Sequence, residues 1–111
     1  MEKITFYRVQ MLAVSDEEVV PQEEEYYFWD KEEAMKFFHK QVWTETHDTD
    51  NSWVADAWEG EEEPCGFPAW WLGGKFDTKR YIVDGHDTSF EFTDTYTGNY
   101  VCWNFKEIIL E

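Results

Sequence analysis

The stretch from Gln41 to Gly74 contains no lysine and no arginine, although the chain of 111 residues has nine of these bases. It carries eight carboxylates, half of the net charge of -16, and it holds five of the seven tryptophans. Acidic side chains without counter-charges, set among large aromatic rings, are typical of a surface that meets another molecule. This stretch is therefore the first place in the chain to look for a binding surface.

Long apolar runs, a signal segment and a cysteine framework are also missing. No apolar run approaches the length of about 20 residues that a membrane-spanning helix needs. The N-terminal Met-Glu-Lys-Ile-Thr lacks the apolar character of a secretory signal, and two cysteines, Cys65 and Cys102, are too few for a disulfide scaffold. We therefore expect a cytoplasmic protein with reduced thiols, with no membrane partner, while a Cys65–Cys102 disulfide stays open.

The shortage of bases argues against direct binding of DNA, RNA or anionic lipid, because those partners need Lys and Arg at the contact. Crowded like charges destabilise a compact state, so the large excess of acidic over basic residues needs an explanation. Solubility is one, and attraction to a basic surface is another. Adaptation to high salt is a third, but seven of the nine bases are Lys, which we do not expect of a halophile.

What is present indicates one α+β domain spanning residues 1–111. The chain is 42% hydrophobic and rich in aromatic residues, which have to supply most of the core. Strand-like patterns occur at Ile4–Val14, Glu25–Trp29, Lys79–Val83, Ser89–Thr95 and Tyr100–Phe105. Ile108 to Leu110 continue the last strand or begin another. Asp84-Gly85 and Thr97-Gly98-Asn99 are predicted turns.

One amphipathic helix is predicted at about residues 30–45. Asp30 and Glu33 have the spacing of a capping box, so the Asp30 carboxylate is expected to accept hydrogen bonds from the first turn. The apolar stripe consists of Ala34, Met35, Phe37, Phe38 and Val42. We expect this stripe to pack on the first two strands of an antiparallel sheet of five or six strands, in the chain order β-β-α-β-β-β.

The acidic stretch itself is less regular. Asn51–Trp58 is predicted to be a short strand or an irregular segment, and Gly60–Pro68 a loop. Ala69–Leu72 is a possible short strand that Gly73-Gly74 ends. Because neighbouring strand residues point to opposite faces, Trp70 and Trp71 are both buried only if both faces are covered. We expect at least one of these two rings to be exposed as an interface anchor.

Part of this stretch has the ligand spacing of a calcium-binding EF-hand loop. The matching residues are Asp48, Asp50, Ser52, Asp56 and Glu59. However, Trp53 occupies the position that needs glycine for a sharp turn, and Gly60 and Pro64 prevent a following helix. We therefore interpret these residues as a solvated acidic segment and expect no metal site.

Neither the histidines nor the cysteines have the pattern of a catalytic site. His39, His47 and His86 lack the spacing of a zinc site. Cys65 follows Glu61–Glu63, and these carboxylates would raise the pKa of its thiol rather than activate it. Carboxylate pairs are too common in this chain to indicate a glycosidase. We expect no enzyme and no cofactor.

In size, charge and compactness the chain resembles the small acidic anti-restriction and anti-CRISPR proteins of phages, some of which act as DNA mimics. The resemblance implies an inhibitor, in the cytoplasm of a bacterial host, of a basic partner such as a nuclease. Carboxylates would replace phosphates, because acids two apart on a strand lie about 6.6 Å apart, near every second phosphate rise of about 3.4 Å. The candidate contacts are Glu23, Glu24, Glu25, Asp48, Asp50, Asp56, Glu59, Glu61, Glu62 and Glu63, with Trp70 or Trp71 as anchor.

Two alternatives remain open. An immunity protein that blocks a basic toxin would have the same composition. A carbohydrate-binding module would use Trp70 and Trp71 as a stacking platform, although the missing signal segment counts against it.

Overall fold

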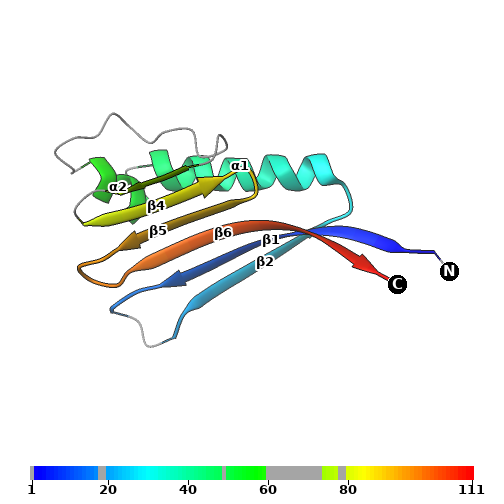
Figure 1. The fold of residues 1–111 in the computed structure, drawn as a ribbon, viewed down its shortest axis with the longest axis horizontal. Coiled ribbons are helices and arrows are strands. Elements are labelled where there is room, and N and C mark those ends of the chain that lie inside the picture. The colour runs from blue at the N-terminus through cyan, green and yellow to red at the C-terminus, as the bar shows by residue number, and fades with distance from the viewer. Residues whose placement is uncertain (1, 18–19, 49, 60–73, 78–79) are drawn as a thin grey trace.

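The fold is an antiparallel six-stranded sheet with two helices on one face (Figure 1). The computed structural model describes residues 2–17, 20–48, 50–59, 74–77 and 80–111. The strand order in the sheet is β2-β1-β6-β5-β4-β3. The elements in chain order are β1 (Ile4–Val14), β2 (Gln22–Phe28), α1 (Lys31–His47), α2 (Trp53–Glu59), β3 (Gly74–Asp77), β4 (Tyr81–His86), β5 (Ser89–Asp94) and β6 (Tyr100–Leu110). The predicted α+β class and the helix on an antiparallel sheet are confirmed.

The centre of the sheet is a long ribbon of β1 and β6. The two strands pair along their whole length, from Ile4 opposite Leu110 to Val14 opposite Tyr100. Side chains alternate between the two faces, and the face under the helices carries the core. The buried sheet residues are Val9, Met11, Tyr81, Val83, Phe90, Phe92, Val101 and Trp103. Val9 and Met11 of β1 and Val101 and Trp103 of β6 therefore lie on the helix side of the sheet.

Helix α1 lies over β2, β1 and β6, and it begins directly after Asp30 as predicted. The Asp30 side chain makes no capping hydrogen bond, so that part of the capping-box prediction is wrong; the Asp30 carbonyl accepts from the Ala34 N–H at 3.1 Å. Every fourth residue is buried: Ala34, Phe38, Val42 and Thr46. Phe37 packs on the Tyr26 ring, with centroids 4.7 Å apart. The helix thus continues to His47, beyond the expected end near residue 45, and its buried face ends with Thr46.

Helix α2 occupies the segment for which the sequence predicted a strand or an irregular structure. Ser52 lies directly before it, and its hydroxyl accepts from the Ala55 N–H at 3.5 Å, at the limit for a helix cap. The first turn then buries Val54 and Ala55, which are 0% and 3% exposed. The pair Trp53-Val54 favoured a strand by propensity. Burial against α1 outweighed that preference, as tertiary packing often does.

Two strand boundaries also differ from the prediction. β2 begins at Gln22 rather than Glu25, because an edge strand pairs on one side only and its acidic side chains stay in water. Gly85, predicted to be in a turn, lies inside β4 opposite Gly74 of β3 and Phe90 of β5. The turn falls at Asp87 and Thr88 instead. Strand β3, which the sequence did not predict, gives β4 a partner on its second side.

The turn between β5 and β6 follows the sequence closely. Gly98 has a φ of 80°, a left-handed conformation that glycine adopts without strain. Beyond this turn, Cys102 is a free thiol on the sheet face away from the helices, opposite Leu12 of β1. Cys65, with which a disulfide is left open, lies outside the described residues. In the described part of the chain, no helix is long and apolar enough to cross a membrane.

Candidate functional site

The strand directions gather four separate segments at one end of the molecule. The β1–β2 connection, the α1–α2 connection, helix α2 and the β5–β6 turn all lie there, and both chain termini lie at the opposite end (Figure 1). We name the first the acidic end and the second the terminal end. The acidic end carries the described carboxylates of Asp16, Glu17, Glu23, Glu24, Glu45, Asp48, Asp50, Asp56 and Asp94.

The only lysine or arginine with a described side chain at the acidic end is Arg80, and Asp94 already neutralises it. The guanidinium donates from Nε to Oδ1 at 2.9 Å and from Nη2 to Oδ2 at 2.8 Å, a bidentate pair. The Arg80 hydrogen bonds lower the pKa of Asp94 to about 2, and the Tyr96 N–H adds to this effect. Arg80 also lies over the rings of Tyr81 and Tyr96, at 5.2 and 4.9 Å. This base is therefore part of the turn structure and offers no counter-charge to its neighbours.

The run from Glu23 to Glu25 does not form one row. Because strand residues alternate, Glu23 and Glu25 lie on the open face of the sheet, and Glu24 lies on the helix side opposite Met11. Glu24 accepts from the Tyr26 hydroxyl at 2.8 Å, which raises the pKa of Tyr26. Glu25 accepts from Tyr27 at 2.6 Å, which likewise raises the pKa of Tyr27. All three carboxylates are exposed.

The Asp48 carboxylate accepts hydrogen bonds from residues of its own turn. Its Oδ1 accepts from the N–H groups of Asp50 and Asn51 at 3.2 Å, and its Oδ2 accepts from the Asn51 amide at 3.0 Å. The Asn51 side-chain hydrogen bond is the main cause of the lowered pKa of Asp48. The carboxylate therefore closes the turn between α1 and α2. Asp50 and Asp56, by contrast, are exposed, and Glu59 lies in the last turn of α2.

The calcium-loop spacing is not realised as a loop. Trp53 to Glu59 form a helix, so the second half of the ligand pattern winds around a helical axis instead of closing on a cation. Among the residues that the structure describes, no group of three or more His, Cys, Asp or Glu could hold a metal ion.

Glu45 has a structural role that the sequence did not reveal. Its Oε2 accepts from the indole N–H of Trp103 at 3.1 Å, and its Oε1 accepts from the Ser52 hydroxyl at 2.9 Å. Ser52 also donates to the Glu45 carbonyl at 2.6 Å. This carboxylate therefore links α1, the start of α2 and the core of β6. No local signal marks it, since its partners are distant in the sequence.

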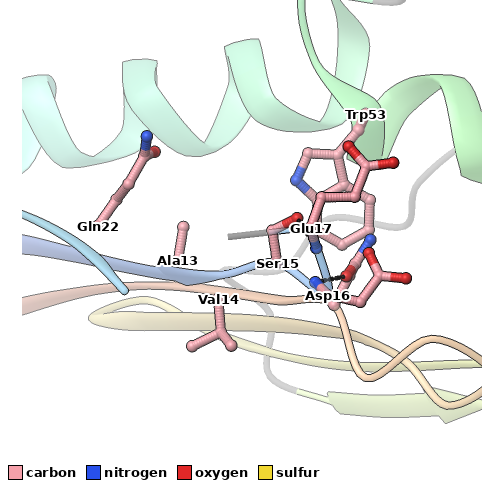
Figure 2. A pocket seen from close by; sticks show the side chains of 8 residues that line it. Ala13, Val14, Ser15, Asp16, Glu17, Gln22 and Trp53 are labelled. Atoms are coloured by element: carbon pink, nitrogen blue, oxygen red, sulfur yellow. Dashed lines mark hydrogen bonds between the residues drawn. The ribbon is translucent and has the colours of Figure 1, made fainter. Parts of the chain in front are cut away.

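A pocket of about 350 Å³ opens at the acidic end (Figure 2). Asp16 and Glu17 border it from the β1–β2 connection, and Trp53 borders it from α2. The other lining residues are Ala13, Val14, Ser15, Gln22 and Asn99. Our sequence-based site did not include Asp16, Glu17 or Trp53. Asp16 and Glu17 lie in the acidic connection between the first two strands, but only the fold brings that connection next to Trp53.

Five candidate contacts lie outside the described residues: Glu61, Glu62, Glu63, Trp70 and Trp71. Of the six acidic candidates with described side chains, none forms an ion pair with another described residue. These six are Glu23, Glu24, Glu25, Asp48, Asp50 and Asp56. They occupy two regions, the β2 edge and the α1–α2 region, rather than one continuous row.

The terminal end has a different surface. Apolar side chains are exposed there, including Trp29 at 78%, Ile4 at 51% and Leu110 at 51%. Trp29 packs edge-on against Phe6, with ring centroids 6.2 Å apart. Bases accompany the acids at this end, and Lys3 pairs with Glu111 at 3.3 Å. The charge of the described residues is therefore sorted along the long axis of the molecule.

Fold and surface together define a small α+β domain with a carboxylate-rich end and an end where acids and bases occur together. No protein-family model, no curated protein and no solved structure matches this chain. Any assignment of function therefore rests on the surfaces described above.

Proposed function

We propose that this protein is an acidic binding protein that inhibits a basic partner, a nuclease or another nucleic-acid-handling protein, through its acidic end. It acts by binding and occlusion and not by catalysis. The observation that carries the proposal is the charge sorting: exposed acids from several chain segments lie at one end, and the described base there is engaged by Asp94. Such a concentration of like charge costs stability, and a basic partner would relieve it.

The charge pattern supports fast, oriented association. The molecule extends 55 × 33 × 23 Å, so its two ends are separated by several Debye lengths of about 8 Å at physiological salt. A positively charged partner would therefore respond to the acidic end separately from the more balanced terminal end. Complementary charge speeds encounter and fixes orientation.

Phosphate mimicry is the specific form of the proposal that links this surface to nucleic-acid-handling partners. Glu23 and Glu25 lie on one face of β2, about 6.6 Å apart by strand geometry. The Tyr27 hydroxyl and the Gln10 amide donate to Glu25, so these two neutral donors orient its carboxylate. Asp50 and Asp56 would supply further negative charges from the helical layer.

The two alternatives are supported to different degrees. An immunity protein that blocks a basic toxin would use the same acidic end, so the identity of the partner alone separates it from a nuclease inhibitor. A carbohydrate platform receives less support. Trp29 and Trp43 are exposed, but Trp29 precedes α1 and Trp43 lies near the end of α1. The helix separates them by about 18 Å along its axis, so the two rings do not form one stacking platform.

The test compares two triple variants that change the net charge equally. The acidic-end variant carries Glu17→Gln, Asp50→Asn and Asp56→Asn, and the terminal-end control carries Glu2→Gln, Glu32→Gln and Glu107→Gln. All six side chains are exposed. Binding to Cas nucleases, restriction enzymes and basic toxin nucleases would be measured by calorimetry across a salt series, together with inhibition of DNA cleavage.

We expect the acidic-end variant to bind a responsive partner at least about tenfold more weakly at low salt, because close complementary charges contribute to both rate and affinity. The control should change affinity by less than about twofold. Salt should weaken the wild type more steeply than the acidic-end variant. Equal losses in the two variants, or affinity that does not depend on salt, would show that the acidic end is not the contact surface.

A further inference from the structure

The pocket at the acidic end has one aromatic wall. Trp53 is the first residue of α2 and is 37% exposed, and its ring makes a T-shaped contact with the Phe92 ring, with centroids 5.4 Å apart. The exposed part of its ring borders the pocket, with the β1–β2 connection on the other side (Figure 2). The indole N–H of Trp53 makes no hydrogen bond to a described residue, whereas that of Trp103 is bonded to Glu45. An aromatic ring packed on one side and open on the other is suited to receive a planar or cationic group.

The backbone of the facing connection is fixed while its carboxylates stay available. The Asp16 N–H donates to Asn99 Oδ1 at 2.7 Å, which ties the connection to the start of β6. The Glu17 N–H donates to the Ser15 hydroxyl at 3.2 Å. Neither the Asp16 nor the Glu17 carboxylate forms a hydrogen bond or an ion pair with any residue in the described ranges. The pocket therefore presents two carboxylates on a positioned backbone, beside an indole ring.

We propose that this pocket receives an arginine side chain of the basic partner, with the guanidinium against the Trp53 ring and its N–H groups directed to Glu17 and Asp16. This inference rests on the proposed function, because it names the chemistry that the acidic end would recognise. A volume of about 350 Å³ is near the lower limit of ligand pockets, which suits a single side chain.

Arginine fits this arrangement better than lysine or a metal cation. A guanidinium is planar, so it can stack on an indole while its edge donates to a carboxylate in a bidentate fashion. An ammonium is a compact, strongly hydrated charge that gains less from the ring. A divalent cation would need several converging oxygen ligands and would gain nothing from Trp53. The same protein already places a guanidinium beside carboxylate and rings in the Arg80, Asp94 and Tyr96 group.

The test is an NMR titration of ¹⁵N-labelled full-length protein with three tripeptides whose termini are capped and therefore uncharged: Gly-Arg-Gly, Gly-Lys-Gly and Gly-norleucine-Gly. We expect saturable shifts from the arginine peptide at the backbone amides of Asp16 and Glu17, at the Asn99 amide and at the Trp53 indole N–H. The lysine peptide should bind several-fold more weakly. The norleucine peptide, which has no charge, should leave these signals unshifted.

Two pairs of variants locate the interaction. Trp53→Leu should weaken arginine-peptide binding about tenfold, the equivalent of a desolvated cation–π contact, while Trp29→Leu at the terminal end should not. Glu17→Gln should also weaken it, and Glu107→Gln should not. Glu17 is exposed, so its variant keeps the experiment decisive even if Trp53→Leu fails to fold.

Three results would overturn the pocket proposal: non-saturable shifts spread over all acidic residues, equal binding of the arginine and lysine peptides, or unchanged binding by Trp53→Leu and Glu17→Gln. None of these would remove salt-dependent inhibition of a basic partner by the acidic end. Conversely, a pocket that binds the arginine peptide while no nuclease or toxin is inhibited would contradict the proposed function alone.

Discussion

The acidic end and the terminal end of this protein are built on the same sheet but differ in the charge of their described residues. At the acidic end, carboxylates from the β1–β2 connection, the α1–α2 region and the end of β5 lie near Arg80, the one lysine or arginine whose side chain the structure describes there, and Asp94 engages it. At the terminal end, Lys3 pairs with Glu111, and Trp29 is 78% exposed beside Phe6. A charge evenly distributed for solubility would not differ between the ends, so this sorting supports a directed interaction.

The carboxylates of the acidic end are themselves of two kinds. Asp94, Glu45 and Asp48 accept several hydrogen bonds from their own chain and hold the turns and helices in place. Asp16, Glu17, Asp50 and Asp56 are exposed, and their carboxylates make no hydrogen bond or ion pair with described residues. The first kind should affect stability, and the second kind should affect binding. The following predictions test that division, from the largest expected effect on stability to the smallest.

The largest effect is expected from Asp94→Asn, which removes the charge that pairs with Arg80. Its side chain is 6% exposed and its pKa falls from 3.8 to about 2, mainly through Arg80 and also through the Tyr96 N–H, so these interactions together contribute about 2 kcal/mol to the free energy of unfolding. Because the pKa is lowered in the folded state, this contribution is complete above about pH 4 and disappears as the pH falls towards 2. Urea unfolding of the wild type and Asp94→Asn from pH 7 to pH 2 measures the difference.

Glu17→Gln is the matched control for that experiment, since it removes a free carboxylate at the same end. Its free energy of unfolding should stay within about 0.5 kcal/mol of the wild type. If Glu17→Gln destabilises as much as Asp94→Asn, the division between structural and free carboxylates is wrong.

An intermediate effect is expected from Glu45→Ala, which leaves the buried indole N–H of Trp103 without its acceptor. A lost hydrogen bond to a buried donor lowers the free energy of unfolding by about 1.5 kcal/mol. Glu45→Gln keeps an acceptor oxygen and should recover most of the loss. Unfolding followed by tryptophan fluorescence reports both variants. Equal destabilisation by Ala and Gln would mean that the negative charge, and not the hydrogen bond, is what matters.

The smallest effect on stability is expected from Trp29→Ser at the terminal end. Because Trp29 is 78% exposed, the free energy of unfolding of the Trp29→Ser variant should differ from that of the wild type by less than about 0.5 kcal/mol. Binding of a hydrophobic dye should fall, since the exposed apolar surface shrinks. Affinity for the basic partner should not change. A large loss of partner affinity in Trp29→Ser would show that the terminal end takes part in the interaction.

Much of the fold could be predicted because local patterns and burial agreed. The strand-like pattern predicted β1 at its observed bounds, Ile4–Val14, and the helical spacing placed Phe38 and Val42 against the sheet. Gly98 marked the last hairpin, because its turn requires a positive φ. The prediction failed where contacts between residues far apart in the chain determined the local secondary structure. α2 became helical through burial of Val54 and Ala55, and Gly85 became a strand residue because β3 and β5 pair with β4 on both sides.

The candidate site was less predictable, for the same reason. The sequence by itself determined how much acid there is, and it identified Gln41–Gly74 as a stretch without bases. Only the tertiary structure decided which carboxylates form hydrogen bonds within their own chain. It also placed Glu24 on the opposite sheet face from Glu23 and Glu25, because strand residues alternate. It also brought Asp16 and Glu17 next to Trp53. Composition fixes a net charge, but the direction of a side chain and its neighbours depend on contacts between segments far apart in the chain.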